Sequence, residues 1–170
     1  MKKLLLATAL AVLTWGFASA QTVDGKVAAG EYAHSKTVLS GAGTLNWTLD
    51  ADGGLTVAVS AKTKGWVGVG FGSDKMDGAY IYFGFVDETG KAVFTEQAGK
   101  GHRHSDSGKV TADKNAVTSV DGTTTIEFHV PAAQLPFSGT DVSFIVASGD
   151  SANLKAYHGG SKEAGKLSLK

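Results

Sequence analysis

Short apolar runs separated by turn-forming residues constrain this chain more than any other feature of its sequence. In TLNWTLDA (44–51) and GLTVAVSAK (54–62), apolar residues recur at every second position. This period of two places one face of a β-strand on a core, and the intervening DADGG (50–54) is a hairpin signal. Few segments show a helical period, so the pattern predicts an all-β protein.

Later segments have the same character and predict further strands: WVGVGF (66–71), AYIYFGFVDETG (79–90), KAVFTEQAG (91–99), NAVTSVDGTTTIEFHV (115–130), DVSFIVASGD (141–150) and GKLSLK (165–170). AYIYFGF is apolar on both faces, which favours a central strand, whereas GKLSLK favours a final edge strand. PAAQLPF (131–137) indicates a short helical turn or loop. We therefore expect an antiparallel β-sandwich of about eight to ten strands, with an immunoglobulin-like two-sheet architecture.

The first twenty residues have the pattern of an export signal. Lys2 and Lys3 precede the apolar run LLLATALAVLTWGF, and Ala18-Ser19-Ala20 forms a cleavage site before Gln21. We predict that residues 1–20 are a cleaved signal peptide and that residues 21–170 form a single domain. A short signal that begins with lysine is typical of bacteria, so the expected location is periplasmic or secreted. No second long apolar run follows, and we expect no stable membrane insertion.

Composition excludes several classes of function. The chain has no cysteine, which rules out disulfides, a lipid-anchored cysteine and thioether-linked haem. Residues 21–170 contain 14 Lys and Arg, because two of the chain's 16 lie in the signal, against 16 Asp and Glu. This balance lacks the basic stripe of a nucleic-acid binder. No nucleophile–base motif or carboxylate pair stands out, so we do not expect a catalytic site.

The loop GSDKMDGA (72–79) contains Met76, one of only two methionines in the chain. Methionine commonly fills gaps in a core, but here Asp74, Lys75 and Asp77 surround it in a loop that solvent should reach. The preceding strand places Gly68 and Gly70 on one face. Two glycines on one strand face indicate that something bulky lies flat against it, either a packed aromatic side chain or the plane of a cofactor.

The five histidines divide into ordinary and candidate functional residues. His34 in a loop and His129 on the polar face of its strand, beside Glu127, are predicted to be ordinary exposed residues. His102 and His104 form H-x-H in the loop GKGHRHSD (99–106), which is compatible with a solvated loop, a copper or zinc site, or the charged edge of a cofactor.

His158 follows a buried strand and is an ordinary loop histidine when taken alone. Together with Met76 it becomes a candidate ligand, because a thioether and an imidazole together are a known axial ligation of haem iron. Without cysteine, such a haem would be held non-covalently as haem b.

Two segments carry a resemblance to the DOMON domain family. GWVGVGFGSDKMDGAYIYFGFVDETGKAVFTEQ (65–97) resembles its core, and VSFIVASGDSANLKAYHGG (142–160) resembles its final strands and histidine-bearing loop. The order and spacing agree from about Val23 to the end of the chain. The resemblance implies a β-sandwich that binds haem b in one branch and sugars in others. In the haem branch, typified by the cytochrome domain of cellobiose dehydrogenase, it implies Met76 and His158 as axial ligands.

Taken together, these features lead to the hypothesis of an exported electron carrier, a b-type cytochrome without a catalytic site of its own. His102 or His104 are substitutes for His158 as the nitrogen ligand. Gly68 and Gly70 leave room for the macrocycle, and the residues expected to pack around it are Trp66, Phe71, Tyr80 and Tyr157. The candidates to pair with the propionates are Lys75, Lys155, Arg103 and His102. No flavin-binding fingerprint or transmembrane cytochrome segment is visible, so the expected partner is a separate redox protein or membrane cytochrome.

Two other readings remain open at this stage. A carbohydrate or small-ligand binding module of the same fold would use Trp47, Trp66 and tyrosines as a stacking platform. A copper-binding protein would use Met76 together with His102 and His104.

Overall fold

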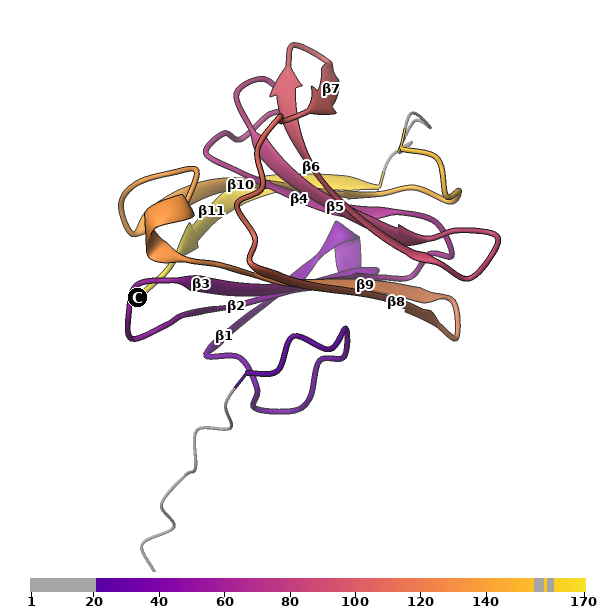
Figure 1. The fold of residues 1–170 in the computed structure, drawn as a ribbon, viewed down its shortest axis with the longest axis horizontal. Helices are drawn as coiled ribbons and strands as arrows, with labels where there is room; N and C mark the ends of the chain where they lie inside the picture. Colours follow the sequence, from indigo (N-terminus) through magenta and orange to yellow (C-terminus); the bar gives the residue numbers. More distant parts are fainter. Residues whose placement is uncertain (1–20, 155–157, 159–160) are drawn as a thin grey trace, which may run out of the picture.

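Two antiparallel sheets face each other in the computed structural model, which describes residues 21–154, 158 and 161–170 (Figure 1). The five-stranded sheet has the order β1-β2-β3-β9-β8, with β1 (His34–Val38), β2 (Gly43–Leu49), β3 (Leu55–Ala61), β8 (Lys114–Val120) and β9 (Thr123–Val130). The six-stranded sheet has the order β11-β10-β4-β5-β6-β7, with β4 (Val67–Phe71), β5 (Tyr80–Val86), β6 (Ala92–Lys100), β7 (Arg103–Asp106), β10 (Asp141–Ser148) and β11 (Lys162–Ser168). The predicted antiparallel β-sandwich is confirmed.

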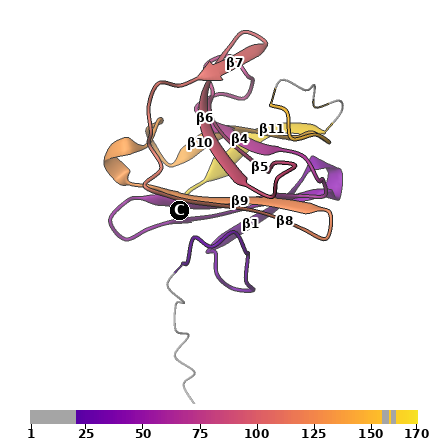
Figure 2. The same ribbon diagram turned by 45° about the vertical axis from the view of Figure 1, so that its right-hand side comes forward.

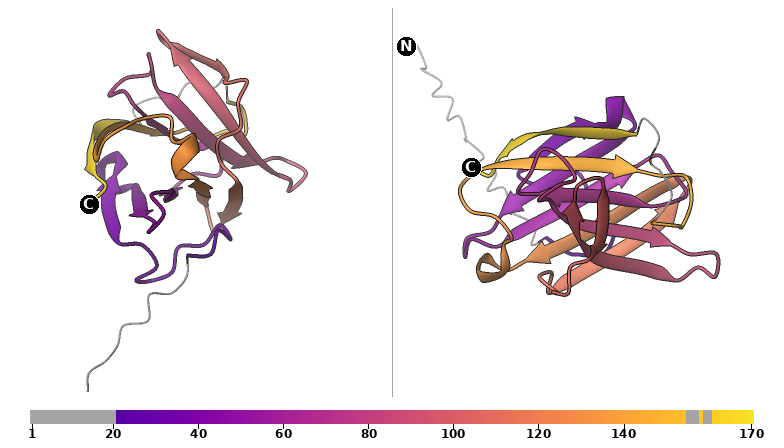
Figure 3. Two further views of the ribbon diagram at one scale, coloured as in Figure 1. Left: turned by 60° about the vertical axis from the view of Figure 1, so that its left-hand side comes forward. Right: turned by 90° about the horizontal axis from the view of Figure 1, so that it is seen from above.

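Most elements follow the sequence pattern. β5 lies inside its sheet and β11 lies at the edge, as expected, and the strands of the six-stranded sheet run side by side when the molecule is viewed from above (Figure 3). The segment after Pro131 forms the single 3-10 turn η2 (Ala132–Gln134), and a second such turn, η1 (Leu39–Gly41), precedes β2. Neither turn, nor any other helix in the described ranges, is long and apolar enough to cross a membrane.

The described part of the chain has eleven strands, one more than the upper expectation, because two histidine-containing segments predicted as loops are strands. His34 begins β1, where its ring stacks on Trp47 of the paired β2 with centroids 5.2 Å apart. His104 lies in β7, which pairs with β6. Both strands are short and polar, so their own sequences show no strand periodicity. They form because each pairs with a neighbouring strand.

Inward-facing side chains of both sheets form the main core. Val57 of β3, Val69 of β4 and Phe128 of β9 are fully buried, and Tyr82 of β5 stacks on Phe128 with ring centroids 4.2 Å apart. Burying side chains of this size contributes about 1.5–3 kcal/mol each. The alternation along β4 also places Phe71 in this core, on the face opposite Gly68 and Gly70.

A second apolar cluster lies on the outer face of the six-stranded sheet. It contains the buried residues Trp66, Ala79, Ile81 and Phe83, with Met76, Phe85, Ile145, Ala147 and Leu154 packed against them. β5 contributes to both clusters because it is apolar on both faces, as its sequence predicted. The outer face of this sheet is therefore apolar enough to need cover from another part of the molecule or from a ligand.

The outer face of the five-stranded sheet is covered by the N-terminal segment (21–33), which runs beneath this sheet in Figure 1. Glu127 of β9 is 0% exposed and accepts hydrogen bonds from the backbone N–H groups of Asp24 and Gly25, both at 2.7 Å, and from the Tyr32 hydroxyl. Glu127, which was expected on a polar strand face, is thus buried in a contact with the N-terminal segment. The two partners are about a hundred positions apart in the sequence.

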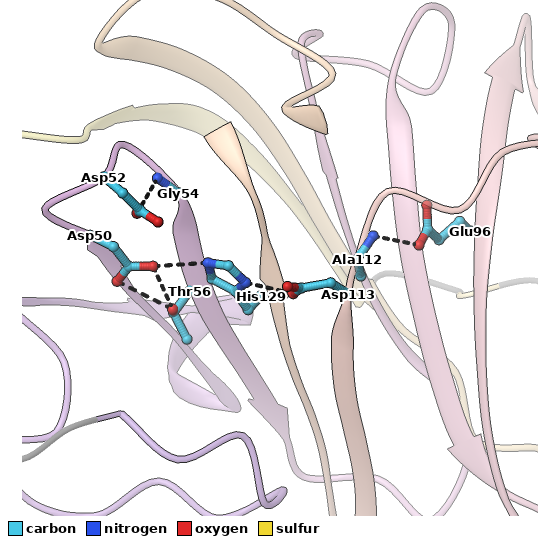
Figure 4. Close-up of polar contacts among 8 residues, drawn as sticks. All are labelled: Asp50, Asp52, Gly54, Thr56, Glu96, Ala112, Asp113 and His129. Atoms are coloured by element: carbon cyan, nitrogen blue, oxygen red, sulfur yellow. Dashed lines mark hydrogen bonds and ion pairs between the residues drawn. The ribbon is translucent and has the colours of Figure 1, made fainter. Parts of the chain in front are cut away.

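His129 is not the exposed residue that its strand pattern predicted. Its Nδ1 lies 2.6 Å from a carboxylate oxygen of Asp113, and its Nε2 lies 3.1 Å from one of Asp50 (Figure 4). The imidazole therefore joins the β2–β3 turn to the start of β8. Nearby, Glu96 of β6 accepts hydrogen bonds from the N–H groups of Thr111 and Ala112, which fixes the connection into β8.

Candidate functional site

A cavity of about 1120 Å³ lies on the outer face of the six-stranded sheet. Its apolar lining includes Trp66, Ile81, Phe83 and Ile145. Polar residues come from three connections: the β4–β5 loop, the β6–β7 hairpin and the β10–β11 connection. The hairpin rises above the sheet in two views (Figures 1 and 2). This volume lies slightly above the range of small-molecule and cofactor sites, which is roughly 300–1,000 Å³.

Met76 reaches the cavity from the β4–β5 loop, which is docked against the hairpin. The Ala79 N–H donates to the Met76 carbonyl at 3.1 Å, and the Gly101 N–H donates to the Asp77 carboxylate at 2.7 Å. Gly99 of β6 has no side chain, and a Cβ there would overlap with the Met76 carbonyl. Asp77 thus fixes the loop to the hairpin, while the half-buried Met76 packs on the outer-face cluster.

His158 lines the same cavity from the opposite connection, between β10 and β11. It is half-buried, and its carbonyl accepts a hydrogen bond from the Ser161 N–H at 3.1 Å. The fold therefore brings Met76 and His158, which are 82 positions apart in the sequence, to the wall of one cavity.

The two histidines of the H-x-H motif occupy different environments. His102 and Arg103 line the cavity as exposed residues, whereas His104 is half-buried. The His104 Nδ1 lies 3.2 Å from Oε1 of Gln97, and its ring packs on Phe83 with centroids 4.8 Å apart. Burial lowers the pKa of His104, and a hydrogen bond with the Leu154 backbone opposes that shift. The His104 imidazole is thus already in contact with Gln97 and Phe83 of the protein.

Packed side chains account for both glycines of β4. A Cβ at Gly68 would overlap with the ring of Phe83, its register partner on β5, and one at Gly70 would come within 2.9 Å of Ile145 and 3.0 Å of Ile81. A packed aromatic side chain thus lies at Gly68, and because Gly68 and Gly70 both line the cavity, their predicted role beside a cofactor stays a prediction. Sequence reasoning missed Phe83, although the outward alternation of β5 indicates it.

The other predicted residues are distributed as follows. Trp66 lines the cavity, is 3% exposed, and meets Phe83 edge to face at 5.3 Å. Phe71 and Tyr80 do not line it, because their positions in β4 and β5 turn them toward the inter-sheet core. The Tyr80 hydroxyl instead donates to the Glu96 carboxylate at 2.6 Å. Tyr157 and Lys155 lie outside the described residues.

Charged side chains surround the cavity. Lys75, Arg103 and Lys162 line it and are exposed, as is Asp74. Glu163 also lines it, but its carboxylate accepts a hydrogen bond from the Leu39 N–H at 2.7 Å. The cavity thus combines a hydrophobic lining with a small number of charged groups, the composition of a site for a largely apolar ligand that carries polar groups.

Comparison with known proteins agrees with this geometry. The DOMON domain family matches residues 39–149, which is more than half of the chain and includes Met76. The chain belongs to the DOMON domain family. The match ends before His158, so the family assignment does not depend on that residue. A search of curated protein sequences found no relative of this DOMON domain.

Two solved structures share the fold of this DOMON domain. The cytochrome b domain of pyranose dehydrogenase from Coprinopsis cinerea has a TM-score of 0.59 at 12% identity, over 79% of this chain and 80% of that one. The cytochrome domain of cellobiose dehydrogenase from Myriococcum thermophilum has a TM-score of 0.52 at 12% identity, over 75% of each chain. At this identity the likeness shows a shared fold.

The alternative readings gain little from the structure. Trp47 is 7% exposed and its Nε1 donates to the Ser168 carbonyl at 2.9 Å, so neither it nor the buried Trp66 presents an open ring face for a sugar. Within the described ranges, no group of three or more His, Asp or Glu side chains is arranged to hold a metal ion. Met76, His102 and His104 all line the cavity, so the copper alternative stays a prediction.

Proposed function

We propose that this DOMON domain is an exported b-type cytochrome that binds haem b non-covalently in the outer-face cavity and transfers electrons. The observation that carries the proposal is the meeting of Met76 and His158 at one apolar cavity of cofactor size. The two fold neighbours, described as cytochrome domains, support the same reading.

The residues present fit haem b. Met76 and His158 supply a thioether and an imidazole, the donor set found in low-spin cytochromes of raised reduction potential. Ile81, Phe83 and Ile145 would exclude water from one face of the macrocycle. Lys75, Arg103 and Lys162 would pair with the propionates at the cavity mouth. Bound haem supplies one-electron redox chemistry.

With Met76 and His158 both engaged in holding the haem, the group would supply one-electron transfer, which is the role of an electron carrier. Its partner would be a separate redox protein or a membrane cytochrome. The signal-like residues 1–20 support export to the periplasm or the medium of a bacterium.

The visible spectrum tests this proposal directly. The protein is purified from haem-replete cells, and its spectrum is recorded oxidised and after reduction with dithionite. We expect a sharp Soret band and resolved α and β bands in the reduced form. A colourless protein that also fails to take up added hemin would reject the proposal and favour sugar or copper binding.

A further inference from the structure

Trp66 has the single buried side-chain nitrogen or oxygen that lacks a hydrogen-bond partner in the described ranges, its Nε1. The residue is 3% exposed and its ring lines the cavity. Trp47, the other tryptophan of residues 21–170, is also buried but donates its Nε1–H to the Ser168 carbonyl at 2.9 Å. A buried donor without an acceptor is rare and costly in folded proteins, so we expect the Trp66 N–H to receive an acceptor from outside these residues.

The N–H edge of this indole ring lies on the β10 side of the outer face. A Cβ on Gly149, the residue after β10, would lie 2.4 Å from the Trp66 Nε1, so only a glycine allows this close approach. The Gly149 N–H also donates to the Trp66 carbonyl at 3.0 Å, which fixes the two residues against each other. Because Nε1 is buried against Gly149, an acceptor in the cavity reaches it when the ring turns toward the cavity that it lines.

An exposed cation lies on the same side of the cavity. The strand registers pair Lys162 with Ala147 and Ala147 with Gly68, so these three positions form one row on the outer face. Trp66 precedes Gly68 by two positions and belongs to the same face, one row further along. Lys162 lines the cavity, and it forms no ion pair within the described part of the chain. An ammonium group and an indole N–H on one wall suit a carboxylate, which accepts hydrogen bonds from both.

We propose that Trp66 and Lys162 form a carboxylate subsite, in which the indole N–H and the ammonium group bind one propionate of the haem. The propionates carry all the oxygen atoms of haem b, and its ring nitrogens are bound to the iron. A hydrogen bond donated to the haem must therefore end on a propionate. The subsite makes the cavity selective for porphyrins with a free carboxylate and fixes one propionate on the β10–β11 side. It rests on the proposed haem function, whereas the unpartnered N–H is a property of the domain alone.

The test compares two protein variants and two porphyrins with wild type. Trp66→Phe removes the N–H and keeps an apolar ring, while hemin dimethyl ester keeps the macrocycle and neutralises both propionates. We expect Trp66→Phe to raise the dissociation constant of hemin roughly ten- to a hundredfold, the effect of losing a hydrogen bond to a charged group, and that of the ester only about two- to tenfold. Trp47→Phe is the matched control: Trp47 does not line the cavity, so both constants should stay unchanged.

Lys162→Gln tests the second half of the subsite. It should raise the dissociation constant of hemin and leave that of the dimethyl ester nearly unchanged, because the ester has no charge to neutralise. Lys166→Gln is the control, since Lys166 is an exposed lysine of the same strand that does not line the cavity. Equal hemin constants in Lys162→Gln and Lys166→Gln would overturn the subsite as proposed.

Urea unfolding without hemin gives a readout that does not depend on haem. Trp66→Phe should lower the unfolding midpoint less than Trp47→Phe, because only Trp47 loses a hydrogen bond that the domain already makes. A larger loss in Trp66→Phe would mean that its N–H has a partner in the domain, and would overturn the inference.

Equal weakening of hemin and its ester in Trp66→Phe would also overturn the inference, since the N–H would then not meet a propionate. If Trp66→Phe does not fold, benzothienylalanine in place of Trp66 removes the N–H alone, and the same comparisons apply. A wild-type domain that binds neither porphyrin would instead reject the proposed haem function, and the inference with it. The two failures are therefore distinguished by whether wild type binds hemin.

Discussion

Met76 has a packing contact in the structure and, in the proposed function, a second role as a haem ligand. Its side chain packs on the outer-face cluster like a core methionine, while its thioether reaches the cavity that also contains His158. Packing alone would be satisfied by leucine, whereas iron ligation requires the sulfur. The two roles can therefore be separated by one substitution.

Met76→Leu should leave the free energy of unfolding of the apoprotein within about 1.5 kcal/mol of wild type, because the side-chain volume is nearly conserved. The hemin-loaded variant should instead change from a low-spin to a high-spin spectrum. Urea unfolding and absorption spectroscopy measure the two effects. A low-spin spectrum identical to that of wild type would remove Met76 from the site.

Gly99→Ala should displace the Met76 loop, because a Cβ at that position overlaps with the Met76 carbonyl. We expect a loss of about 1–3 kcal/mol of stability from the forced backbone shift, together with weaker hemin binding. Lys100→Ala, the next residue of β6 and an exposed one, is the control. Equal hemin affinity in both variants would show that the loop position does not matter for binding.

Among the elements, the N-terminal segment depends on one buried carboxylate. Glu127 is its main anchor, and burial, the largest effect, raises the Glu127 pKa above its ordinary value despite hydrogen bonds that act in the opposite direction. The folded state therefore holds this proton more strongly than the unfolded state. The associated stability is complete below the unfolded pKa, near 4.5, and is lost as the pH rises through the folded pKa.

Glu127→Gln should remove this pH dependence, since the amide keeps an acceptor for the N–H groups of Asp24 and Gly25 and does not ionise. The unfolding free energy of the variant relative to wild type should thus rise as the pH increases from 4.5. Chemical unfolding at a series of pH values measures this difference. A difference that stays flat across the series would contradict the raised pKa.

At the scale of the whole molecule, the β-sandwich can be predicted from the sequence more fully than the candidate site. β3 is a local pattern of period two and β5 is a short run that is apolar on both faces, and both strands appear where expected. The contact of Glu127 with Asp24 joins residues 103 positions apart, and no local pattern encodes it. The cavity depends on the same kind of distant contact: Phe83 and Leu154 line it, yet neither carries a chemical signature in the sequence.

The mature protein should begin at Gln21. The small-residue pattern Ala18-Ser19-Ala20 ends immediately before Gln21, as a cleavage site does. Intact-mass measurement of protein recovered from the periplasm or medium tests this cleavage. A mass that retains residues 1–20 in such a fraction would contradict the signal peptide.

The cavity lies outside the core between the two sheets, so the folding of the sheets and the binding of a ligand in the cavity are separate processes. The cavity is lined largely by the outer-face cluster of the six-stranded sheet, whereas the inter-sheet core is a separate cluster of side chains. We expect the empty domain to melt cooperatively, and hemin at a hundredfold excess over its dissociation constant to add about 2.7 kcal/mol. If the proposed haem function holds, we therefore expect hemin to bind to the already folded domain.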